Sequence, residues 1–236
     1  MTKDRPDRAN RGREVTRIEA FVDAAFAFAV TLLVISLDVP ENARAMIEAL
    51  KGVPAFAASF SLLAMIWWAH ASWSRRYGLD DGRSVLLSLL LVFLVLVYVY
   101  PLRIIFSMFF NWASQGWLPS SVTIESMGDL EVMFAAYAVA WTTLGCVTVA
   151  LYHHAWRLRE RLGLDRAERI ELRGSLAAQA MIPATGFVAL LVLGIAHVLG
   201  KPELAPFSGF AYGLMGFTGL AVLRARRRAE REVQQA

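Results

Sequence analysis

Six long apolar segments dominate this chain and restrict the folds open to it. Each is about 20 residues long, the length that a helix needs to cross about 30 Å of hydrocarbon. They cover residues 18–37, 53–73, 84–110, 130–152, 175–199 and 207–223. With 57% hydrophobic residues in a chain of 236, a soluble domain would lack polar surface to cover its core. The sequence predicts an all-α membrane protein with six transmembrane helices in a single domain, residues 1–236.

The segment at 85–99 is apolar on every face, which argues against the alternating strands of a membrane barrel. Basic residues then set the orientation of the helices, because positively charged loops stay in the cytoplasm. Of the 24 Lys and Arg residues, 20 fall before the first segment, in the loops around residues 75–83 and 157–173, or after the last segment. We therefore expect both termini to be cytoplasmic. High Ala, Leu and Arg content and short loops suit a bacterial inner (plasma) membrane.

The basic tail at residues 224–228 is interpreted as a contact with anionic lipids at the cytoplasmic face, and no nucleic-acid partner is expected. Cys146 is the sole cysteine, so a disulfide within one chain is excluded. Its apolar neighbours predict a thiol packed in the core.

Sequence signatures of enzymes are missing. The chain contains no Gly-x-Ser-x-Gly elbow, no His-Glu-x-x-His pair and no phosphate-binding loop. His153 and His154 are adjacent, and neighbours on a helix point about 100° apart, which makes a poor metal site. We expect no enzymatic activity, no catalytic or metal-binding residue and no cofactor.

The first apolar segment carries Asp23, and an ionisable residue inside a membrane helix indicates a functional site. Arg17 lies six positions earlier, which is not the spacing of an ordinary helical ion pair. The second segment runs back toward the cytoplasm and ends in Trp67 and His70, at a similar membrane depth. We therefore predict a buried polar network of Arg17, Asp23, His70 and Trp67 that braces helix 1 against helix 2.

Helix 1 also carries an apolar stripe at helical spacing, formed by Phe28, Leu32 and Ile35, with Thr31 beside it. Such a stripe usually serves packing or lipid contact. The alternative is that the polar network holds this stripe toward a pore.

The motif Arg17-x-x-x-Phe21-Val22-Asp23, together with Trp67-x-x-His70, resembles the prokaryotic relatives of the endolysosomal transmembrane potassium channel. That family carries an Arg-x-x-x-Phe-Ser-Asp signature, here matched at Arg17, Phe21 and Asp23. The similarity covers helices 1 and 2 closely and the other helices in outline.

The resemblance implies a homotetramer whose central pore is lined by helix 1 and which lacks the carbonyl filter of ordinary potassium channels. The family's constriction positions fall five, nine and twelve residues after the signature aspartate, at Phe28, Leu32 and Ile35. Its threonine layer matches Thr31. K⁺ would be the permeant ion, with other monovalent cations as further candidates, and hydrophobic dewetting would form the closed gate.

The sequence departs from the family pattern at two positions: Val22 replaces the signature serine, and Phe28 replaces the usual aliphatic residue of the constriction. Three functions follow as hypotheses. The first is a leak-like K⁺ channel, the second a proton-coupled carrier that uses Asp23 and His70 as a relay. The third is a membrane scaffold that conducts nothing.

Overall fold

The computed structural model describes residues 15–35 and 41–234, and within these ranges it contains helices and no strand. The elements are α1 (Arg17–Ile35), α2 (Ala43–Leu50), α3 (Val53–Tyr77), α4 (Gly82–Ala113), α5 (Met127–Arg157), α6 (Arg166–Val198), the 3₁₀ helix η1 (Pro202–Phe217) and α7 (Thr218–Gln234). The predicted all-α class is confirmed.

Five stretches of the described residues are long and apolar enough to cross a membrane: α3, α4, α5, α6, and the continuous stretch Pro202–Arg227 made by η1 and α7. Each corresponds to one predicted segment, although the helices run beyond the predicted limits. For example, α6 begins at Arg166 rather than at residue 175. Hydropathy misses such extensions because their side chains are charged. The first predicted segment matches α1, a helix of 19 residues, and its last two positions lie outside the described residues.

Local sequence explains where the turns after α3 and before α6 fall. At the start of α6, Asp165 and Glu168 form a capping box in which each side chain accepts a hydrogen bond from the other residue's backbone N–H. At the end of α3, Gly78 adopts a φ of 55°, a left-handed conformation that glycine enters without strain. The chain can therefore reverse direction within a few residues.

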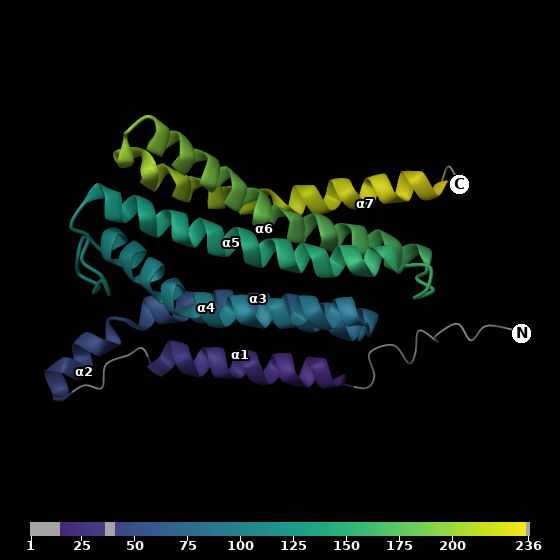
Figure 1. Cartoon of the computed structure of the whole chain (residues 1–236), viewed down its shortest axis with the longest axis horizontal. Coiled ribbons are helices and arrows are strands. Elements are labelled where there is room, and N and C mark those ends of the chain that lie inside the picture. The colour runs from purple at the N-terminus through teal and green to yellow at the C-terminus, as the bar shows by residue number, and fades with distance from the viewer. Residues whose placement is uncertain (1–14, 36–40, 235–236) are drawn as a thin grey trace, which may run out of the picture.

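Figure 1 shows the long helices lying side by side, with α1, α3 and α4 in one half and α5, α6 and α7 in the other. The start of α1, the turn from α3 to α4, the turn from α5 to α6 and the end of α7 all lie at one end of the bundle. These are the segments that carry most of the basic residues of the described chain. The arrangement agrees with helices that alternate in direction.

Glycines allow α5 and α6 to approach closely. A Cβ atom added at Gly186 would overlap Thr142 Oγ1, and one added at Gly145 would lie 2.6 Å from Pro183 Cδ. Small residues permit such close packing between membrane helices. The two helices thus form a tightly packed pair in the half of the bundle away from α1.

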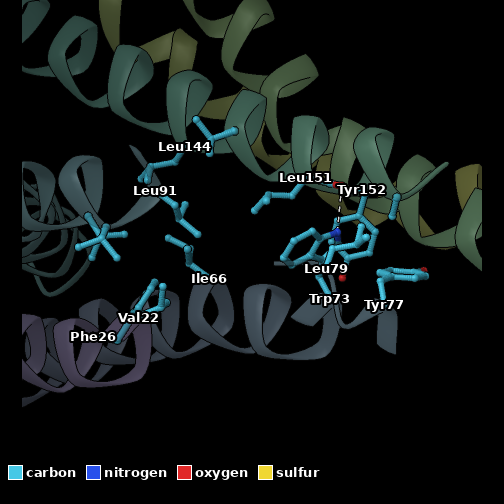
Figure 2. Close-up of a cluster of buried hydrophobic side chains, with 14 of the residues drawn as sticks. Val22, Phe26, Ile66, Trp73, Tyr77, Leu79, Leu91, Leu144, Leu151 and Tyr152 are labelled. Atoms are coloured by element: carbon cyan, nitrogen blue, oxygen red, sulfur yellow. Dashed lines mark hydrogen bonds between the residues drawn. The ribbon is translucent and has the colours of Figure 1, made fainter. Parts of the chain in front are cut away.

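The main core lies where α1, α3, α4 and α5 meet. Figure 2 shows Val22 and Phe26 of α1 on the same side of the cluster as Ile66 of α3, with Leu91 and Leu144 beyond it. All five side chains are buried. This core fixes one face of α1 against the rest of the subunit.

Cys146 corrects one prediction, because its side chain is exposed on α5 and is not packed in the core. In a membrane protein, a lipid-facing residue and a core residue have the same apolar neighbours in the sequence. Hydropathy alone therefore could not separate the two environments.

Candidate pore helix and its polar anchors

One face of α1 is buried in the subunit. Val22, Phe26, Ala29 and Leu33 are each at most 4% exposed. Their spacing of three and four residues places them along one side of the helix. This side is occupied by the subunit's own core and is closed to any ion.

The opposite face of α1 is uncovered in the single chain. Phe21 is 53% and Phe28 is 56% exposed, and Ala24 and Thr31 are exposed as well. Thr31 donates a hydrogen bond from Oγ1 to the Ala27 carbonyl, 3.1 Å away, so its hydroxyl oxygen stays free to accept another. Apart from Arg17 at the first turn of the helix and this one hydroxyl layer, the uncovered face is apolar.

The three predicted constriction residues do not share one environment on α1. Phe28 lies on the uncovered face, whereas Leu32 is half-buried at its border and packs against the core. The side chain of Ile35 lies outside the described residues. Thr31, predicted to lie beside the stripe, belongs to the uncovered face.

Asp23 and Trp67, two members of the predicted polar network, are in direct contact. The indole Nε1 of Trp67 donates a hydrogen bond to Asp23 Oδ1 over 2.7 Å, joining α3 to α1. A hydrogen bond to a charged acceptor is short and strong, and more so where water is scarce. This contact is the anchor of α1 at the level of the signature motif.

His70 and Arg17 are placed elsewhere. The His70 ring is 2% exposed, and its Nε2 lies 2.9 Å from Ser88 Oγ, so this histidine joins α3 to α4. Arg17 is exposed at the start of α1. Among the described residues, no hydrogen bond or ion pair joins either of them to Asp23. Spacing along the chain indicates the depth of a residue such as His70 but not the direction of its ring.

Glu19 is a residue of this region that the sequence reasoning missed. Its side chain is buried and accepts a hydrogen bond from Ser74 Oγ over 3.2 Å, and Arg75 Nε lies 3.7 Å from its other carboxylate oxygen. A signal was present in the sequence, since Glu19 precedes Asp23 by four positions and the two carboxylates therefore share one face of the helix.

The structure gives a physical reason why valine fits at the signature serine position. Val22 is fully buried and belongs to the main apolar cluster. A hydroxyl at this position would need a hydrogen-bond partner within that apolar surrounding. Valine instead adds to the packing that holds α1 in place.

Three comparisons with known proteins agree. A family model described as the endosomal/lysosomal potassium channel TMEM175 matches residues 17–101, which include α1, α3 and most of α4. A protein of Marivirga tractuosa named "Potassium channel" is 30% identical over 215 residues, covering 89% of this chain and 86% of that protein. The crystal structure of a variant of the potassium channel MtTMEM175, in complex with a nanobody–MBP fusion protein, superposes with a TM-score of 0.78 at 26% identity, covering 98% of both chains.

Proposed function

Because the chain belongs to the TMEM175 family of potassium channels, we propose that it conducts K⁺ through a pore lined by the uncovered face of α1. The family and the relatives are ion channels, so the protein is an integral membrane protein and not an enzyme. The observation that carries the proposal is the division of α1 into a buried face and an uncovered apolar face.

A single chain has no pore on this face, so the proposal includes assembly into a homotetramer. Phe21 and Phe28 are large, apolar and more than half exposed in one subunit. Four copies that bring their α1 helices together would cover these side chains and enclose a central path. Rings of apolar side chains at Phe28, Leu32 and Ile35 would narrow that path, with a ring of Thr31 hydroxyls among them.

Conduction through such a path depends on the cost of removing water from the ion. An apolar ring offers no ligand to replace lost water, so the ion with the weaker hydration, K⁺ rather than Na⁺, passes at lower cost. When the ring closes further, the path dewets and the closed state follows. The Thr31 hydroxyl supplies a polar contact next to the constriction. This mechanism produces a leak-like K⁺ conductance and requires no carbonyl filter or cofactor.

The proposed topology has six membrane helices, with α1 as the first and both termini in the cytoplasm. Support comes from the end of the bundle that gathers the start of α1, the end of α7 and the basic turns. Arg224, Arg226 and Arg227 are exposed on α7 and would meet anionic lipid head groups at this surface. In the proposed setting, a bacterial inner membrane, these lipids lie on the cytoplasmic side.

The deciding experiment measures cation flux into liposomes that contain the purified protein, with K⁺ and Na⁺ gradients compared. We expect passive flux that favours K⁺ and does not saturate, and a lower preference for K⁺ in Leu32→Ala. Flux that saturates and follows the proton gradient would instead support a carrier. A monomeric protein without flux would leave only the scaffold hypothesis.

A matched control separates the pore from the lipid-facing surface. Phe93 on α4 is 61% exposed, close to the exposure of Phe28. Phe93→Ala and Phe28→Ala therefore remove the same ring from an exposed site, and only the second lies on α1. Equal effects of the two substitutions on K⁺ over Na⁺ preference would contradict a pore lined by α1.

A further inference from the structure

A second polar contact joins α1 to α3 at Glu19, one of the unspecified positions within the signature motif. Glu19 is 4% exposed and Ser74 is 3% exposed, and the Ser74 hydroxyl donates to Glu19 Oε2 over 3.2 Å. Burying a carboxylate is costly unless it is hydrogen-bonded, so a buried glutamate in this place indicates a specific task. Glu19 points into the subunit, opposite to the uncovered face, and therefore does not touch a passing ion.

The two contacts lie at different levels of the same pair of antiparallel helices. On α1, Glu19 and Asp23 are one turn apart, and on α3 their partners Ser74 and Trp67 are two turns apart. One contact alone leaves α1 able to rotate or tilt about it. Two contacts at separate levels fix both the rotation and the axial position of α1 on α3.

We propose that Glu19 is a positioning residue for conduction, which sets the rotation of α1 through the hydrogen bond from Ser74 and thereby sets which side chains face the pore. The inference rests on the proposed function, since it needs α1 to line the pore. Rotating α1 by part of a turn would swing Leu32, at the border of the uncovered face, toward or away from the proposed pore axis, together with Phe28 and Thr31. The width of the constriction follows from that rotation.

The hydrogen bond from Ser74, rather than the ion pair with Arg75, sets the rotation of α1. Arg75 Nε lies 3.7 Å from Glu19 Oε1, and the Arg75 side chain is 59% exposed. An ion pair with an exposed partner contributes little to the stability of the fold, because water screens the charges and the long side chain loses entropy when it is held in place. The buried Ser74 hydroxyl has no comparable competition from solvent.

Two substitutions at Glu19 isolate the hydrogen bond. Glu19→Gln keeps an oxygen that accepts from Ser74, whereas Glu19→Met fills similar space and offers only a weak acceptor. In liposomes we expect Glu19→Gln to retain the K⁺ over Na⁺ permeability ratio. In Glu19→Met the ratio falls by about fivefold, the factor that corresponds to one hydrogen bond of ~1 kcal/mol.

The partner side of the bond provides a test even if Glu19→Met does not fold. Ser74→Ala removes the donor and is expected to lower the ratio as Glu19→Met does, with no further loss when the two are combined. Ser59→Ala is the matched control, because Ser59 is a buried serine on the same helix whose hydroxyl bonds within α3, to the Ala55 carbonyl at 2.8 Å. It should leave the ratio unchanged.

The outcomes separate the inference from the function on which it rests. Wild-type protein without K⁺ flux overturns the proposed function and the inference together. Wild-type flux with an unchanged ratio in Glu19→Met and Ser74→Ala overturns the inference alone. A ratio that falls equally in Glu19→Gln and Glu19→Met, or in Ser59→Ala and Ser74→Ala, also overturns it, since the hydrogen bond would then not be the cause.

Discussion

The two faces of α1 differ in the kind of interaction that they use. The face toward the subunit combines an apolar core, with Val22 and Phe26, and two carboxylates hydrogen-bonded to α3, Glu19 and Asp23. The uncovered face carries aromatic and small apolar side chains and the hydroxyl of Thr31. The two carboxylates therefore hold the helix in position, and the face proposed to meet the ion is uncharged beyond Arg17 at its first turn.

This difference teaches that a charged residue in a membrane helix need not contact the transported ion. Asp23 stands out in the sequence because a charge in hydrocarbon is costly. The structure shows its carboxylate bound to the Trp67 indole. Substitutions on the buried face should therefore affect stability and position, and substitutions on the uncovered face should affect permeation.

The largest effect is expected from Asp23→Leu. This change leaves the Trp67 N–H without its acceptor. An unsatisfied polar group costs about 1–3 kcal/mol when it is buried, and because this site is partly buried we expect the lower end of that range, about 1 kcal/mol. We expect a lower midpoint of thermal unfolding and loss of the proposed tetramer, measured by circular dichroism and by size-exclusion chromatography with light scattering in detergent. Asp23→Asn keeps an oxygen for Trp67 and should retain more of the assembly. Full stability in Asp23→Leu would show that Asp23 is not an anchor.

Phe28→Ala should have the next largest effect, on permeation rather than stability. Removing an exposed ring from α1 widens the proposed constriction, so dewetting becomes harder. We expect a higher cation flux and a lower K⁺ over Na⁺ ratio in liposomes, with an unfolding midpoint near that of wild type. A change in stability without a change in the ratio would reverse the assignment of the two faces.

Thr31→Val should have a smaller effect. Valine keeps the shape of threonine and removes the hydroxyl, which in the proposed pore offers the ion one polar contact. Loss of a contact worth ~1 kcal/mol would lower K⁺ conductance by about fivefold at most. Single-channel recording measures the conductance. Thr31→Ser, which keeps the hydroxyl, is the control. Equal conductance in the valine and serine variants would remove Thr31 from the ion path.

The smallest effect concerns a hydrogen bond between a histidine and an aspartate away from α1. His154 Nε2 on α5 lies 2.9 Å from Asp81 Oδ2 in the turn before α4, and Ser84 donates to the same carboxylate over 2.6 Å. Partial burial opposes ionisation of Asp81, but the hydrogen bonds from Ser84 and His154 outweigh it, so the pKa of Asp81 lies below its ordinary value.

Because the pKa of Asp81 is lower in the folded protein than in an unfolded chain, its carboxylate stabilises the fold at pH values above the ordinary pKa of about 4. This contribution disappears as the pH falls through the folded pKa. We expect it to be less than ~1 kcal/mol, since the pair is partly exposed. Unfolding midpoints of wild type and Asp81→Asn should differ at pH 7 and converge at low pH, with the K⁺ over Na⁺ ratio equal in both. A different ratio would mean that this turn influences α1.

The sequence by itself determined the helical class, the five membrane-spanning stretches outside α1, and the family. Hydrophobic length decides whether a helix can cross a bilayer, and that property belongs to each segment separately. The pairing of Asp23 with Trp67 was also accessible, because both sit near the same end of neighbouring segments. The four-residue spacing of Glu19 and Asp23 also indicated that the two carboxylates share one face of α1, although the signature motif does not specify Glu19.

Only the tertiary structure decided which way each side chain points. It directed His70 toward Ser88 rather than Asp23, placed Leu32 at the border of the uncovered face, and exposed Cys146. The physical reason is that lipid and protein core are both apolar, so hydropathy does not distinguish the face of a membrane helix that packs from the face that does not. That distinction arises only when helices pack against one another.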